Sequence, residues 1–92
     1  MRSISLIHSR KIKSELGKEM KLEYYLINDS VLNGCAECYG VEVRARAPGG
    51  GSYAGIPYIT MIGSRIFQLL DRLAECEVTP QSLYAVIEDW LC

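Results

Sequence analysis

The chain has 92 residues, of which 49% are hydrophobic and 23% are charged, and its net charge is −1. This length fits one domain, residues 1–92, and the composition excludes a disordered chain. The sequence pI of about 5.8 is unlike the basic footprint of nucleic-acid-binding domains, so we expect no nucleic acid as the main partner.

The N-terminal segment is the most basic part of the chain. Residues 1–21 carry six of the ten lysines and arginines, and weak nucleic-acid binding by this segment is our third functional hypothesis. The apolar run at 4–7 is too short for a signal peptide or for the roughly 20 residues of a spanning helix. We therefore predict a cytoplasmic protein that makes no membrane contact.

Four segments have the composition of β-strands. Residues 36–46 give the clearest pattern, because apolar and charged side chains alternate there with a period of two. Residues 20–27 alternate in the same way, and residues 3–13 are the least regular. Residues 53–60 include Pro57, which cannot donate a ladder hydrogen bond and is therefore expected on an edge strand. Glycine, asparagine, aspartate and proline predict turns at 15–18, 28–34 and 48–52.

The periodicity changes after Ile62. A helical stripe follows, formed by Ile66, Leu69, Leu70, Leu73 and Cys76. Thr79 and Pro80 predict the start of a second helix, with threonine as the cap and proline at the first helical position. We expect Cys76, Trp90 and Leu91 to be buried.

Together these patterns predict an α+β fold. Residues 1–62 form an antiparallel meander of three to four strands, and residues 63–92 form a C-terminal pair of antiparallel helices that packs on one face of the sheet. The other face is expected to remain open, as antiparallel sheets allow.

Three segments resemble a family of uncharacterised proteins. Residues 24–27 form a tyrosine-rich strand, residues 39–43 continue Tyr-Gly with alternating apolar residues, and residues 78–91 form the closing helix. They resemble a family of about 90-residue proteins of unknown function from Clostridia-type bacteria, which end in an SPxHLYDVVEDFL-like helix. Ser82 and Ala85 stand where that motif has histidine and aspartate, so any site built on those residues is missing here. The resemblance implies the fold but no mechanism.

Cys35 and Cys38 form the one motif with chemical character. Two thiolates spaced in this way can bind zinc or exchange a disulfide, and a thiol or zinc site on this pair is our alternative functional hypothesis. The competing interpretation is a turn cysteine beside a strand cysteine. It is favoured because no second ligand pair accompanies the motif, and because alternate strand residues point to opposite faces.

The sequence contains no catalytic constellation. His8 is the one histidine, and no nucleophile is placed beside it. The glycine-rich segment 47–52 lacks the Lys-Ser/Thr pair of a phosphate-binding loop and is read as a hairpin connection. We therefore predict that the protein is not an enzyme and has no cofactor.

The predicted open face carries a mixture of aromatic and charged side chains that suits a protein contact. We expect an interaction surface there and predict a protein-interaction or small regulatory domain that binds a protein partner or a second copy as a homodimer. The residues expected to form this surface are Glu23, Tyr25, Glu42, Arg44 and Arg46.

Overall fold

The computed structural model describes residues 2–13 and 17–91. Within these residues it contains four strands, one short 3₁₀ turn and two α-helices. In chain order they are β1 (Arg2–Lys13), β2 (Glu19–Val31), η1 (Leu32–Gly34), β3 (Ala36–Ala47), β4 (Gly50–Thr60), α1 (Gly63–Glu75) and α2 (Leu83–Leu91). None of the helices in this part of the chain is long and apolar enough to cross a membrane.

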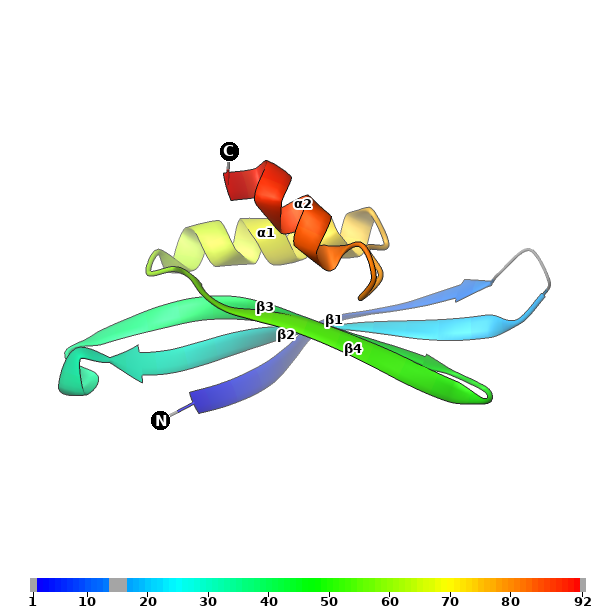
Figure 1. Ribbon diagram of the computed structural model, residues 1–92, viewed down its shortest axis with the longest axis horizontal. Helices are drawn as coiled ribbons and strands as arrows, with labels where there is room; N and C mark the ends of the chain where they lie inside the picture. Colours follow the sequence, from blue (N-terminus) through cyan, green and yellow to red (C-terminus); the bar gives the residue numbers. More distant parts are fainter. Residues whose placement is uncertain (1, 14–16, 92) are drawn as a thin grey trace.

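The strands form one antiparallel sheet in the order β1-β2-β3-β4, so each strand pairs with its sequence neighbour. Both helices lie on the same face of this sheet, and α2 runs back across α1 at an angle (Figure 1). The predicted α+β meander is confirmed, and the irregular segment 3–13 is part of a full strand.

The core lies between the sheet and the helices. Successive strand residues point to opposite faces, so one face of β2 and β3 supplies apolar side chains and the other supplies charged ones. On the covered face Tyr24 lies opposite Val43 and Leu22 opposite Ala45, and all four are buried. The helices close this layer with fully buried leucines and isoleucine at Ile66, Leu69, Leu70, Leu73 and Leu83.

A tight turn joins β3 to β4. Ala47 pairs with Gly50, so Pro48 and Gly49 form the whole connection. Proline fixes φ near −65°, and Gly49 has φ 109°, which together reverse the chain within two residues. Most of the glycine-rich segment 47–52 is therefore strand, whereas the sequence predicted a longer turn at 48–52.

The outer strand β4 contains a bulge. Tyr39 pairs with Thr60 and Val41 with Ile56, so the single residue Gly40 faces the segment 57–59. A Cβ atom on Gly40 would lie 2.3 Å from the carbonyl oxygen of Ile56, so only glycine fits without a backbone shift. Pro57 lies in this bulge on an edge strand, as predicted.

Several element ends differ from the predictions. Residues 28–31 continue β2, because they pair with residues 36–39, and do not form a turn. Half of the predicted turn at 15–18 lies outside the described residues. In the described half, Gly17 has φ 77°. Helix α2 begins at Leu83, and Thr79 bonds Ser82 (Oγ1 to Oγ, 2.8 Å) in the turn before it.

The predicted burial at the helix ends is only partly right. Cys76 is exposed, because the chain leaves α1 there and reverses at Glu77, which has φ 50°. Leu91 is also exposed, since it lies in the last turn of α2. Trp90 is half-buried, and the guanidinium carbon of Arg65 lies 4.8 Å from its ring centroid.

Candidate interaction face

The open face is the side of the sheet that α1 and α2 leave uncovered (Figure 1). The strand pairing places Glu23 opposite Arg44 and Tyr25 opposite Glu42, with Arg46 in the next row. All five residues predicted for the interaction surface therefore lie side by side on this face, because each has the strand parity opposite to the core residues.

Ion pairs bind these side chains to one another. Arg46 Nε donates to Glu23 Oε1, and Arg44 Nε donates to Glu42 Oε2. The Arg44 guanidinium carbon also lies 4.3 Å from the ring centroid of Tyr25, in cation–π contact. These bonds fix the orientation of two arginines that would otherwise be free in solution.

The carboxylate of Glu23 is buried beneath its partners, and the residue is 6% exposed. The hydrogen bond from Arg46 holds the pKa of Glu23 below its usual value, although burial opposes this shift. The same bond raises the pKa of Arg46, and the bond to Glu42 raises the pKa of Arg44. Glu23, Arg44 and Arg46 are therefore all charged at neutral pH.

One end of the open face is apolar. Ile4 lies opposite Ile27 and Leu6 opposite Tyr25. Ile4 is 43% exposed and Leu6 is 50% exposed. Ile27, which lies on β2 between these β1 residues and β3, is buried. Together with Tyr53, which lies opposite Arg44 and is 76% exposed, they give this face accessible apolar area beside its arginines.

The apolar end is bordered by a second ion pair. Arg2 Nε donates to Asp29 Oδ1 over 2.9 Å. This bond raises the pKa of Arg2, and Tyr58 contributes further. Asp29 is buried, and its other oxygen, Oδ2, makes no hydrogen bond with the described residues.

Cys35 and Cys38 do not gather a ligand set. Cys35 is exposed at the turn after η1, whereas Cys38 lies on β3 with its Sγ donating to the Thr60 carbonyl oxygen over 3.6 Å. Over residues 2–13 and 17–91, no group of three or more histidine, cysteine or acidic side chains is arranged to hold a metal ion.

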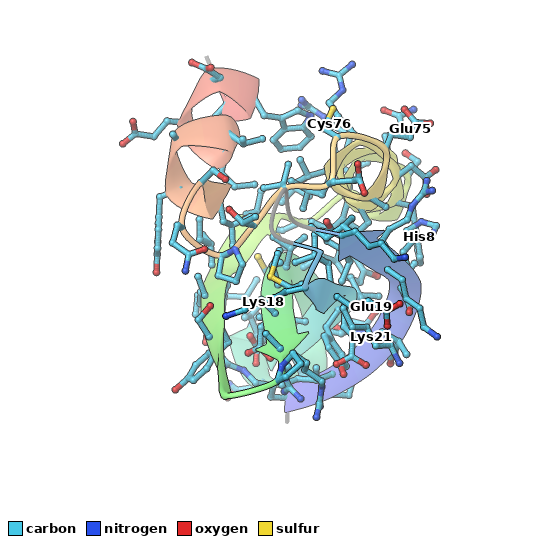
Figure 2. All side chains as sticks on the ribbon, turned by 90° about the vertical axis from the view of Figure 1, so that its right-hand side faces the viewer. His8, Lys18, Glu19, Lys21, Glu75 and Cys76 are labelled. Atoms are coloured by element: carbon cyan, nitrogen blue, oxygen red, sulfur yellow. The ribbon has the colours of Figure 1, made fainter. Side chains whose placement is uncertain are left out.

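His8 pairs with a residue that sequence reasoning did not connect to it. Its Nε2 lies 2.6 Å from Asp71 Oδ1 of α1, and both side chains are exposed. Figure 2 views the molecule from the end at which β1 finishes and shows His8 close to the helix layer. The pair ties the edge strand β1 to α1. Because 63 residues separate the partners, no local signal in the sequence predicts it.

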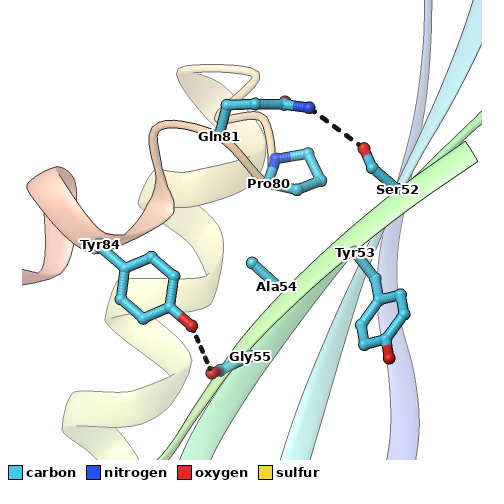
Figure 3. Close-up of a pocket in the computed structure, with 7 residues that line it drawn as sticks. All are labelled: Ser52, Tyr53, Ala54, Gly55, Pro80, Gln81 and Tyr84. Carbon is cyan, nitrogen blue, oxygen red and sulfur yellow. Dashed lines mark hydrogen bonds between the residues drawn. The ribbon is translucent and has the colours of Figure 1, made fainter.

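A groove of about 470 Å³ lies between β4 and the start of α2. Tyr84 donates from its hydroxyl to the Gly55 carbonyl oxygen over 3.4 Å, and Gln81 Nε2 donates to Ser52 Oγ over 3.3 Å (Figure 3). Tyr53 also lines the groove but points away from it (Figure 3). These bonds attach α2 to the outer strand, so we assign the groove a structural role.

The comparisons with known proteins place the chain in a family. A family model described as "Family of unknown function (DUF6514)" matches residues 3–92, and the chain belongs to this family. The resemblance noted in the sequence to an uncharacterised family is therefore confirmed. Neither the curated proteins nor the solved structures contain a significant match.

Proposed function

For this member of a family of unknown function, we propose a non-catalytic protein-interaction domain that binds its protein partner through the open face. The observation that carries the proposal is the centre of that face. There Arg44 is held over Tyr25 by Glu42, beside the exposed side chains of Leu6 and Tyr53.

The composition of this centre matches that of binding hot spots. Arginine and tyrosine are enriched in protein interfaces and contribute much of their binding energy. Arg44 is already fixed by its bond to Glu42. It therefore loses less side-chain entropy on binding than a free arginine would.

The size of the face also suits a protein partner. The molecule measures 48 × 27 × 17 Å. Figure 1 looks down the shortest axis with the helices above the sheet, so the strands run along the longest dimension and the width of the sheet lies along the shortest one. A standard interface buries roughly 800 Å² on each partner, which a face of these dimensions can supply.

Charge favours an acidic partner over a second copy. Among the described residues the open face carries six cations and four carboxylates, a balance of +2, from Arg2, Lys11, Lys13, Lys21, Arg44 and Arg46 against Glu19, Glu23, Asp29 and Glu42. Two such faces would repel each other, whereas a net-negative surface with an apolar part would complement this one.

A matched charge reversal tests the proposal. Arg44→Glu reverses a charge at the centre of the open face, and Arg72→Glu makes the same change at an exposed position of α1. Immobilised wild type and both variants are incubated with an extract of cells that produce the protein, and the retained proteins are quantified by mass spectrometry. We expect a partner that wild type and Arg72→Glu retain equally and that Arg44→Glu retains roughly tenfold less.

Thermal unfolding by circular dichroism verifies that the variants are folded, and Arg44→Gln replaces Arg44→Glu if the charge reversal unfolds the chain. Equal retention by all three proteins, loss with Arg72→Glu alone, or no retained protein would contradict the proposal. Sedimentation equilibrium is expected to show a monomer. A dimer that Arg44→Glu dissociates would identify a second copy as the occupant instead.

A further inference from the structure

Three cations form a continuous row across the open face, near the end of the sheet at which β1 finishes, β2 begins and the β3–β4 turn lies. Lys11 of β1 is directly opposite Lys21 of β2, and Lys21 is directly opposite Arg46 of β3. Adjacent strands are about 4.8 Å apart, so the row spans about 10 Å. Like charges directly opposite each other destabilise a sheet, and here two such pairs lie next to each other across three strands.

Protection of the sheet edge explains only one member of the row. Lysines on edge strands hinder pairing with other chains, and this accounts for Lys11 on β1. Lys21 and Arg46 lie on the two central strands, where no edge needs protection. Their position opposite each other therefore needs another reason.

The carboxylates nearby only partly offset the row. Glu23 accepts from Arg46 and lies 3.9 Å from Lys21, so one buried carboxylate serves two cations. The ion pairs of the described residues include none for Lys11. Glu19 lies opposite Lys13 in the next row. The two rows and Glu23 together hold four basic and two acidic side chains, a net charge of +2.

The row also borders a cavity. An open hollow of about 280 Å³ is lined by all three residues, by Glu19 and, just beyond the last β2–β3 pair, by Met20, Ala47 and Pro48. Lys21 and Glu19 are seen near this end of the sheet in Figure 2. Basic residues from three strands thus border one space, and Met20, Ala47 and Pro48 form its apolar wall.

We infer that this hollow is a binding site for a diphosphate group, held by Lys11, Lys21 and Arg46. Two ammonium groups on flexible stems and one planar guanidinium provide donors for an anion that has several terminal oxygens and more than one charge. A single carboxylate offers too few oxygens to engage all three. The apolar wall leaves room for an organic group attached to the diphosphate. These three residues lie on the open face and contribute to its charge, but the inference does not depend on the proposed function, which is carried by Arg44, Tyr25 and Glu42.

Titration with two probes tests this site. Backbone amide shifts of the wild-type protein are followed by NMR as inorganic pyrophosphate or a nucleoside diphosphate is added at constant ionic strength. We expect saturable shifts centred on Met20, Lys21, Arg46 and Ala47. Lys21→Gln should weaken binding about tenfold or more, whereas Arg72→Gln, the same charge change on α1, should leave it unchanged.

The variants also measure how the row of cations affects the stability of the fold. Without a probe, Lys21→Gln should unfold at about the same temperature as wild type, because it removes two like-charge contacts together with the 3.9 Å ion pair to Glu23. That combination of weaker binding and undiminished stability separates a ligand site from a structural role. Lys11→Gln serves as a second variant with the same expectation, since its side chain lies on an edge strand.

The relative affinity of the two probes identifies the kind of ligand. Equal affinity for both probes supports a free diphosphate as the ligand, and tighter binding of the nucleoside diphosphate supports an ester whose organic part uses the apolar wall. Shifts that do not saturate, that spread over the whole surface, or that are equally large in Lys21→Gln would overturn the inference.

Discussion

The two faces of the sheet bury different kinds of side chain, although the same strands form both. The covered face is apolar and packs against α1 and α2, with Tyr24, Val41 and Val43 fully buried. The open face buries Glu23 and Asp29 instead, and it does so through ion pairs with Arg46 and Arg2. Apolar burial stabilises a fold far more than exposed ion pairs do. The covered face therefore maintains the structure, and the open face contributes less to stability.

The largest expected effect comes from a leucine on the covered side. Leu73→Ala removes a fully buried side chain of α1 and should lower the free energy of unfolding by about 2–5 kcal/mol. Leu6→Ala makes the same change at a half-exposed position of the open face and should cost less than about 1 kcal/mol. Chemical denaturation measures both. Equal losses would mean that the two faces contribute alike to stability.

Alkaline pH should weaken the covered face. Burial raises the pKa of Tyr24 to about 12. A raised pKa in the folded state gives stability that is present below pH 10, the usual tyrosine value, and is lost as pH rises towards 12. The loss should reach about 3 kcal/mol at most, and Tyr24→Phe should show a flatter dependence over this range. An unchanged slope in the variant would show that other groups drive alkaline unfolding.

The bulge provides a test of backbone packing between β3 and β4. Gly40→Ala would place Cβ 2.6 Å from the Pro57 Cα and should destabilise the fold by about 1–3 kcal/mol. Gly55→Ala is the matched control, because its Cβ would meet only the Glu42 side chain at an ordinary 3.5 Å. Urea unfolding of both variants measures the difference. A neutral Gly40→Ala would mean that β4 pairs with β3 without this close approach.

The smallest expected effect comes from the ion pairs of the open face. Glu23→Gln should lower stability at pH 7 by about 1–2 kcal/mol, because it removes the partner of Arg46 and Lys21. The lowered pKa of Glu23 gives stability that is present above the unfolded value of about 4.3 and is lost as pH falls through the folded value. The variant and wild type should therefore converge only once the pH falls below the lowered pKa of Glu23 in the folded state. A constant difference at all pH values would rule out the ion pair as its cause.

Local patterns were sufficient for the elements and for their faces. The alternation in 36–46 predicted β3 and placed Glu42, Arg44 and Arg46 together, because burial on one side of a pleated strand imposes a period of two. The stripe from Ile66 to Leu73 predicted α1 for the corresponding reason.

Features that depend on the pairing between strands could not be predicted from the sequence. Asn28–Ser30 have turn propensity, but pairing with β3 overrides it and extends β2. The bulge opposite Gly40 and the row of Lys11, Lys21 and Arg46 depend on strand register, which no single segment encodes. Cys76 fits the helical stripe, but the stripe does not reveal where the helix leaves the sheet.

Two exposed tyrosines allow the most direct test of the difference between the faces. Tyr53 on the open face is 76% exposed, and Tyr84 on α2 is 57% exposed. Each is replaced in turn by the photo-crosslinking residue p-benzoylphenylalanine, which keeps the aromatic ring, and cells that produce the protein are irradiated. We predict that position 53 forms a discrete adduct with a partner protein and that position 84 does not. An adduct at position 84 alone, or equal adducts at both positions, would contradict the assignment of the open face as the binding surface.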